Sequence, residues 1–199
     1  MCTANVCRSP MAEALLRLHL RAAAVSATAA SAGTRAEESL PAAPYARRAV
    51  PGLGEHRSRR LTSEMISAAD LVLAMANEHL REVVAAEPDS FVRSFTLRDF
   101  AARAARHGAR SAGETFSEWV AAVAADRSVS DLVATTSPAA DDIADPMGGE
   151  LVDHQITAAE LSHLLRDLVT LAWPPQEVRA SGARPPSARA RDGSRAGAS

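Results

Sequence analysis

The sequence predicts a single α/β domain with a parallel β-sheet, followed by a tail. Short apolar runs alternate with segments of helical periodicity along most of the chain. One of these runs, Leu71–Met75, is apolar throughout, as is typical of a buried strand. The 199 residues, 47% of them apolar, suit one core with an extension better than two domains.

The first element expected is a helix over residues 9–22. Ser9 can cap its N-terminus, and Pro10 suits the first helical position, where no backbone N–H is needed. Its apolar face would consist of Met11, Leu15 and Leu18.

The middle of the chain predicts short strands and helices. A strand is expected over residues 25–31, ending at the turn sequence Ser31–Thr34. Residues 41–60 are rich in Pro, Gly and Arg, so an exposed, irregular connection is expected there. The later elements expected are a short helix after Thr62, a helix near 77–86, a strand near 91–96, and helices around 97–106 and 114–126.

The last helix has the clearest pattern. Thr157 and Glu160 have the spacing of a capping box, and Pro174 would end the helix. Its apolar stripe comprises Leu161, Leu164, Leu165, Leu168, Leu171 and Trp173. The following residues are almost wholly Ala, Arg, Ser, Gly and Pro without periodicity. We therefore predict a domain over residues 1–173 and a disordered tail over residues 174–199.

Composition excludes several classes of protein. A net charge of −2, from 22 basic and 24 acidic side chains, gives no reason to expect nucleic acid or an anionic membrane as partner. No apolar run approaches the roughly 20 residues that span a bilayer, and the N-terminus lacks the layout of a secretory signal. We therefore expect a cytoplasmic protein. The six histidines show no metal-ligand spacing and are interpreted as structural or exposed.

The chemistry is predicted at the N-terminus, where the loop Cys2–Ser9 leads into the first helix. Such a loop directs several backbone N–H groups at one point, and the helix dipole adds positive charge there, so a phosphate fits without a metal. Arg8 can bind two phosphate oxygens with its planar guanidinium. The same positive field favours the thiolate of Cys2, to which Ser9 is placed to donate a hydrogen bond. With only two cysteines, Cys2 and Cys7, the chain fits reactive thiol chemistry better than a disulfide scaffold.

These residues are part of a longer pattern. Cys-x5-Arg-Ser-Pro begins at Cys2, although Cys-x5-Arg alone occurs in several unrelated phosphatase folds. The matches that narrow the choice are Asn5, Met11-Ala12-Glu13, Ser31-Ala32-Gly33-Thr34, Ala69–Met75, Phe95–Phe100 and Asp145-Pro146. In combination they resemble the low-molecular-weight protein tyrosine phosphatases, whose loop is shared by related arsenate reductases. The resemblance spans residues 2–173 and implies a three-layer domain with a parallel four-stranded sheet.

The resemblance also implies a mechanism without cofactor or metal. Cys2 would attack phosphorus and form a cysteinyl-phosphate, and Asp145 would protonate the leaving group and then activate water. The phosphate-binding residues would be Thr3, Ala4, Asn5, Val6, Cys7, Arg8 and Ser9. The partner would be a tyrosine-phosphorylated protein. Asn5 would hold the strained loop backbone, and Cys7 would pair reversibly with Cys2 under oxidation.

Two departures from the family pattern stand out. Family members enter the loop from a central strand, whereas here Met1 directly precedes Cys2. The first central strand is therefore expected to be missing, with two sheet edges left unpaired, and the natural protein is expected to begin further upstream. Met147-Gly148-Gly149 follows the Asp-Pro pair in place of the usual aromatic residues, and the chain's one tyrosine, Tyr45, lies in the variable connection, which predicts a weaker preference for phosphotyrosine.

Two other functions stay open from the sequence. Arsenate reduction would need an external thiol, because the chain has no cysteine outside the loop. A non-catalytic phosphate-binding or redox-sensing module would bind phosphate without turnover, or switch a partner through a Cys2–Cys7 disulfide.

Overall fold

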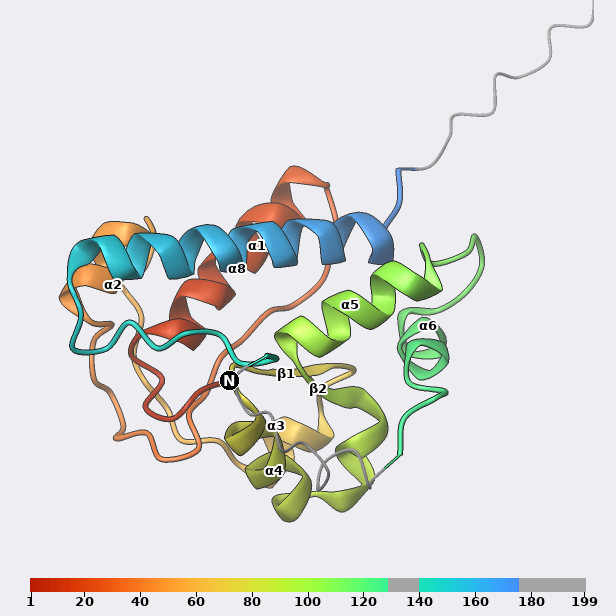
Figure 1. Cartoon of the computed structure of the whole chain (residues 1–199), viewed down its shortest axis with the longest axis horizontal. Coiled ribbons are helices and arrows are strands. Elements are labelled where there is room, and N and C mark those ends of the chain that lie inside the picture. The colour runs from red at the N-terminus through yellow and green to blue at the C-terminus, as the bar shows by residue number, and fades with distance from the viewer. Residues whose placement is uncertain (129–139, 176–199) are drawn as a thin grey trace, which may run out of the picture.

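The computed structural model describes residues 1–128 and 140–175. Its helices and strands, in chain order, are α1 (Arg8–Ala22), α2 (Pro44–Ala49), α3 (Ser63–Ser67), β1 (Val72–Ala74), α4 (Asn77–Ala86), the 3-10 helix η1 (Pro88–Arg93), β2 (Ser94–Thr96), α5 (Leu97–His107), α6 (Phe116–Val123) and α8 (Leu151–Ala172). Helices α1, α5 and α8 lie on one side of the two strands, and α3 and α4 lie on the other (Figure 1). The α/β class expected from the alternation of elements is therefore confirmed.

The sheet in the described residues is small and parallel. β1 pairs with β2 in the register Val72↔Ser94 to Ala74↔Thr96. Two isolated parallel bridges, Cys2↔Gly33 and Gly33↔Arg60, add further pairing at the start of the chain. Threonine side chains cap the N-termini of three helices. Thr62 accepts a hydrogen bond from the Met65 N–H of α3, and Thr96 and Thr115 cap α5 and α6 in the same way.

The N-terminus lies between β1 and the segment that follows α1. The Met1 amino group donates to the carbonyl of Leu73 at 2.5 Å, and the Met75 N–H donates to the Met1 carbonyl at 2.9 Å. On the other side, the Thr34 N–H donates to the Cys2 carbonyl at 3.0 Å. These bonds fix Cys2, the first residue of the loop before α1, beside the strands.

The largest of three apolar clusters in the described residues supports this arrangement. Its fully buried members include Met11 on α1, Phe95, Phe100, Trp119 and Leu161. Phe100 packs against Phe95 and edge-on against Trp119, with ring centroids 4.7 and 5.7 Å apart. Helices α1 and α8 pack against each other (Figure 1).

Several expected elements differ in the structure. Residues 41–60 are the expected exposed, irregular connection only in part: α2 lies within them, and Ala46, Val50 and Leu53 are buried. The segment 25–31 contains no strand. Of the strand expected near 91–96, the first part is η1, since Pro88 favours the start of a helical turn.

The start of the last helix was also predicted wrongly. α8 begins at Leu151, with a capping box made by Glu150 and Asp153, whereas Thr157 is buried inside the helix. A threonine followed three residues later by a glutamate can also occur by chance in the interior of a helix. This spacing alone therefore does not mark the N-terminus of a helix. The tail predicted to be disordered lies, from residue 176, outside the described residues.

Candidate active site

The loop from Cys2 to Cys7 leads directly into α1, whose first residue is Arg8. Cys2, Asn5, Cys7, Arg8 and Ser9 are each at most 6% exposed. The first N–H groups of a helix have no partner within it, and the helix dipole adds positive charge at the same place. The entrance of α1 therefore suits an anion such as a phosphate group.

Asn5 organises the loop from inside. Its backbone has a positive φ of 56°, in the left-handed region that asparagine tolerates better than most residues. The Asn5 Nδ2 donates to Ser9 Oγ and to Ser31 Oγ, both at 2.9 Å, and Asn5 Oδ1 accepts from the Arg59 N–H at 3.0 Å. His56 Nε2 lies 2.8 Å from the Asn5 carbonyl. The strained conformation is therefore held at both ends of the side chain and at the backbone.

Ser9 contacts the candidate nucleophile. Its Oγ lies 3.0 Å from Cys2 Sγ. The same oxygen accepts from Asn5 Nδ2, which leaves the hydroxyl proton of Ser9 free to be donated, although either atom of the Cys2–Ser9 pair can be the donor. The expected role of Ser9 as helix cap is wrong, since Cys7 occupies the N-cap position without a side-chain cap and Ser9 is already in the helix.

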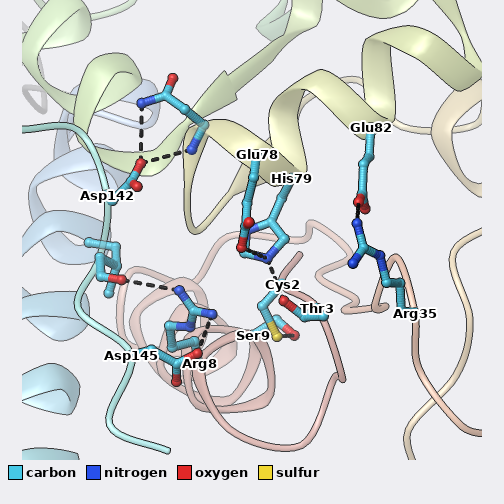
Figure 2. A network of polar contacts seen from close by, with 12 residues as sticks. Cys2, Thr3, Arg8, Ser9, Arg35, Glu78, His79, Glu82, Asp142 and Asp145 are labelled. Carbon is cyan, nitrogen blue, oxygen red and sulfur yellow. Dashed lines mark hydrogen bonds and ion pairs between the residues drawn. The ribbon is translucent and has the colours of Figure 1, made fainter. Parts of the chain in front are cut away.

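Thr3 is tied to α4 by a buried histidine. Thr3 Oγ1 lies 2.8 Å from Nε2 of His79, which is only 1% exposed (Figure 2). Burial, and after it the charge of Arg8, lowers the pKa of His79 from 6.5 to about 4. At neutral pH the imidazole is therefore uncharged and holds the Thr3 hydroxyl by a neutral hydrogen bond.

Gly33 packs against the loop from the neighbouring segment. A Cβ at this position would lie 2.4 Å from the Thr3 carbonyl oxygen and 2.9 Å from the Asn5 nitrogen. Both atoms are backbone, so no side-chain rotation relieves the collision. Only glycine permits this approach.

Asp145 is brought to the loop from the far end of the sequence. Arg8 Nη2 donates to Asp145 Oδ2 at 2.5 Å, and Arg8 Nη1 donates to the Ile143 carbonyl at 3.2 Å (Figure 2). The Asp145 side chain is 45% exposed, whereas that of Arg8 is 7% exposed. A carboxylate at this position faces both the buried arginine and solvent.

The segment that carries Asp145 is fixed by two anchors. The Ile143 N–H donates to the Met75 carbonyl at 2.8 Å, directly after β1. Asp142 Oδ1 accepts from the N–H and Nδ2 of Asn77, at 2.8 and 3.1 Å, at the start of α4. Of the aspartates near the end of the domain, Asp142 is thus hydrogen-bonded to the start of α4, whereas Asp145 contacts Arg8.

Cys7 is a free, buried thiol, as is Cys2. Burial, followed by the nearby charges of Asp145 and Cys2, raises the pKa of Cys7 to about 12. Cys7 is therefore protonated at neutral pH, and a thiol in this state is a poor nucleophile. Its pairing with Cys2 under oxidation stays a prediction.

Three residues of this site were not recognised from the sequence. His56 and His79 were interpreted as structural or exposed, and Gly33 was noted as part of a turn and of the family pattern but without a contact to the loop. Each acts through a contact with the loop across a long stretch of chain, such as the 76 residues between Thr3 and His79. The turn sequence Ser31–Thr34 was the one local signal that pointed towards this contact.

Neither metal chemistry nor a membrane span is indicated in the described ranges. Residues 1–128 and 140–175 contain no group of three or more His, Cys, Asp or Glu side chains placed to hold a metal ion. Among the helices of these same residues, none has the length and apolar character needed to cross a bilayer.

Comparison with known proteins gives consistent matches. The sequence model described as low molecular weight phosphotyrosine protein phosphatase matches residues 1–112. A protein-arginine-phosphatase of Bacillus subtilis (strain 168) is 30% identical over 84% of this chain and 91% of its own length. A probable low molecular weight protein-tyrosine-phosphatase, EpsP of Ralstonia solanacearum, is 39% identical over 49% of this chain and 67% of its own.

Solved structures agree with these relatives. The low molecular weight protein tyrosine phosphatase of T. tengcongensis has a TM-score of 0.63 at 30% identity, covering 84% of this chain and 93% of its own. The YwlE arginine phosphatase of Geobacillus stearothermophilus has a TM-score of 0.58 at 28% identity, covering 84% and 86%. These names support the phosphatase interpretation and give no support to arsenate reduction.

Proposed function

Because this chain belongs to the low molecular weight phosphotyrosine protein phosphatase family, we propose that it hydrolyses phosphoproteins with Cys2 as nucleophile, Arg8 as phosphate ligand and Asp145 as proton donor. One observation carries the assignment of roles: Arg8, at the helix entrance beside Cys2, bonds Asp145 across 137 residues of sequence. This contact supports the proposal that Cys2, Arg8 and Asp145 act together at the start of α1.

In the first step, the Cys2 thiolate attacks phosphorus opposite the leaving group. The S–P bond forms as the bond from phosphorus to the leaving atom breaks, and Asp145 gives its proton to that atom. The amides of residues 3–8 and the Arg8 guanidinium bind the equatorial oxygens, where negative charge grows. The Ser9 hydroxyl, whose oxygen lies 3.0 Å from the sulfur, can donate a hydrogen bond to the attacking thiolate.

In the second step, water hydrolyses the cysteinyl-phosphate. Asp145, now ionised, takes one proton from the attacking water, and the S–P bond breaks to restore the thiolate and release inorganic phosphate. The sum is hydrolysis of one phosphoryl bond, so no oxidant, reductant or cofactor is required.

Two protein substrates fit this chemistry. Phosphotyrosine is the substrate expected from the resemblance and from the name of the family. Phosphoarginine is the second candidate, because the B. subtilis relative matched over 91% of its length is named a protein-arginine-phosphatase. After Asp145-Pro146 the exposed residue is Met147, at 52%, rather than an aromatic residue that would favour a phenyl ring.

The test is hydrolysis of an aryl phosphate, a phosphotyrosine peptide and a phosphoarginine peptide by the 199-residue chain. We expect Cys2→Ser to abolish turnover of every substrate, and Asp145→Asn to lower kcat by about a hundredfold. Full activity of Cys2→Ser would refute the nucleophile. The ratio of kcat/KM for the two peptides assigns the substrate class.

We further propose that the apolar groove beside Met1 is the place of an additional, central strand. The groove has a volume of about 970 Å³ and lies between residues 26–32, α1 and β1. Met1 and Cys2 already bond to β1 on one side and to the segment 32–34 on the other, as the last residues of a parallel strand would. A strand continuing upstream from Met1 would complete the predicted four-stranded sheet.

This proposal is tested by extending the chain at its N-terminus. A short Val- and Ile-rich extension should raise the free energy of unfolding and the specific activity, because it buries apolar area and supports the loop. A matched extension interrupted by proline, which cannot donate to the sheet, should do neither. Equal effects of the two extensions would contradict the proposed strand.

A further inference from the structure

The first turn of α4 contacts both parts of the candidate active site. Asn77 donates from its N–H and its Nδ2 to Asp142, in the segment that carries the proposed proton donor. Two residues later, His79 Nε2 lies 2.8 Å from Thr3 Oγ1, in the loop directly after the proposed nucleophile. The residue between them, Glu78, therefore belongs to the turn that joins the loop to the acid-bearing segment.

The Glu78 carboxylate lies on the side of this turn that faces the loop. Its Oε1 is 3.4 Å from His79 Nε2, the same nitrogen that contacts the Thr3 hydroxyl (Figure 2). The Glu78 side chain is nevertheless 68% exposed, so a ligand that enters from solvent can reach it. Glu78 therefore places an accessible carboxylate beside the first residues of the loop.

The negative charge of Glu78 is not neutralised by a neighbouring cation within the part of the chain that the structure describes. Its ion-pair partner there is His79. Burial, and after it the charge of Arg8, lowers the pKa of His79 to about 4, so the imidazole is uncharged at neutral pH. Glu82, one turn further along α4, pairs instead with Arg35. The carboxylate of Glu78 is therefore available to a cationic group of a substrate.

The two candidate substrates differ in the charge next to phosphorus. In phosphoarginine, phosphorus is bonded to a nitrogen of a guanidinium, so a positive charge lies directly beside the phosphate. In phosphotyrosine, phosphorus is bonded through oxygen to an uncharged ring. A carboxylate beside the loop repels the phosphate of both substrates but attracts only the guanidinium. It therefore favours phosphoarginine over phosphotyrosine.

We propose that Glu78 determines the substrate class of this site: its carboxylate binds the guanidinium next to phosphorus, so that the chain acts on phosphoarginine in preference to phosphotyrosine. This rests on the proposed function, in which the loop after Cys2 holds the phosphate. Glu78 takes no part in bond formation or cleavage, which belong to Cys2 and Asp145. The exposed Met147, in place of an aromatic residue, acts in the same direction, because it offers a phenyl ring no stacking partner.

The experiment measures binding in the Cys2→Ser background, where the substrates are not consumed. Two peptides of one sequence, with phosphoarginine or phosphotyrosine at the same position, are titrated by fluorescence anisotropy. We expect the phosphoarginine peptide to bind more tightly. Glu78→Gln should weaken its binding about two- to fivefold and should not weaken binding of the phosphotyrosine peptide. Glu78→Asp, which keeps the charge, should keep the preference.

Two controls separate charge from packing. Glu87→Gln removes a carboxylate at the other end of α4 and should change neither dissociation constant. Raising the ionic strength from about 0.05 to about 0.5 M should reduce the effect of Glu78→Gln, because salt screens an exposed charge. An effect of equal size at both ionic strengths would contradict the charge argument.

Tighter binding of the phosphotyrosine peptide, no binding of the phosphoarginine peptide, or equal effects of Glu78→Gln on both peptides would overturn the proposal. The binding readout does not depend on turnover. An inactive wild-type chain whose Cys2→Ser variant shows the expected preference would therefore contradict the proposed hydrolysis alone. Normal activity on an aryl phosphate without that preference would contradict only the role of Glu78.

Discussion

At the scale of single residues, the candidate site depends on close backbone approaches as much as on its reactive groups. Gly33 and Thr3 meet at a distance that leaves no room for a Cβ atom. The loop that would hold phosphate is therefore positioned by a residue with no chemistry of its own.

Replacing Gly33 with alanine should displace the loop. The added Cβ would lie 2.4 Å from the Thr3 carbonyl oxygen, so the backbone must move. We expect kcat/KM to fall at least about tenfold and the protein to lose about 1–3 kcal/mol of stability. Gly54→Ala, where no atom lies within 4 Å of the new Cβ, is the control in activity assays and thermal unfolding. Equal behaviour of the two variants would argue against the role of Gly33.

His79 should make stability depend on pH. Its pKa of about 4 in the folded protein lies below 6.5, so between these values the unfolded chain binds more protons. The free energy of unfolding should therefore fall as pH decreases from 6.5 to 4, by up to about 3 kcal/mol. The charged groups around the imidazole are Arg8, the Met1 amino group, Glu78, Glu82 and Asp142.

Chemical denaturation of wild type and His79→Gln at a series of pH values checks this prediction. The wild type should lose more stability than the variant across that interval. The Met1 amino group, whose pKa is lowered to about 6, titrates in both proteins and cancels in the difference. Parallel curves for the two proteins would contradict the assignment.

The sequence predicts residues of the site where they are neighbours in the chain. Cys2, Arg8 and Ser9 are contiguous with a helix start, so elementary electrostatics suggests their chemistry. The contacts of Gly33 and His79 with the loop depend on folding: the turn sequence Ser31–Thr34 marks the place of Gly33 but not its partner, and no local pattern marks His79. Ser9 shows that the exact start of a helix is harder to predict: its place beside Cys2 was expected, but it lies within α1 and does not cap it.

Among the structural elements, the segment 140–146 carries Asp145 to its contact with Arg8. It has no regular secondary structure, yet it is pinned to the residues after β1 and to the start of α4. Its position therefore depends on anchors that lie before Asp145 in the chain.

Asp142→Ala should release one of these anchors. Loss of both bonds to Asn77 should lower kcat about five- to tenfold with little change in KM, because Asp145 is less well placed while the phosphate loop is intact. Asp141→Ala removes the neighbouring half-buried carboxylate and should have a smaller effect on kcat. Steady-state kinetics on an aryl phosphate gives kcat and KM for both variants. An equal loss of kcat in Asp142→Ala and Asp141→Ala would contradict the anchor role of Asp142.

Helices were predicted better than strands. α4, α5 and α6 lie close to their expected ranges because capping residues such as Thr96 and Thr115 mark their starts. β1 and β2 contain three residues each, too few for periodicity to define their ends. The start of α8 was missed because its first turns expose Val152 and Ile156, which hides the apolar stripe.

At the scale of the whole molecule, the fold places three distant parts of the sequence around the N-terminus of α1. The loop follows Met1, Gly33 comes from the segment after α1, and Asp145 precedes α8. The α/β class could be predicted from alternating elements, whereas α2 inside residues 41–60 could not, because its Pro-, Gly- and Arg-rich surroundings are typical of loops.

In the proposed reaction Cys2 carries the phosphoryl group during turnover, and this cysteinyl-phosphate can be trapped. The Asp145→Ala variant should accumulate the cysteinyl-phosphate, because hydrolysis of the intermediate needs this carboxylate. After acid quenching during reaction with an aryl phosphate, peptide mass spectrometry should find the phosphoryl group on the peptide that contains Cys2, and Cys2→Ser should remove the cysteinyl-phosphate. Turnover with no phosphorylated Cys2, or with the label on Cys7 alone, would contradict the account.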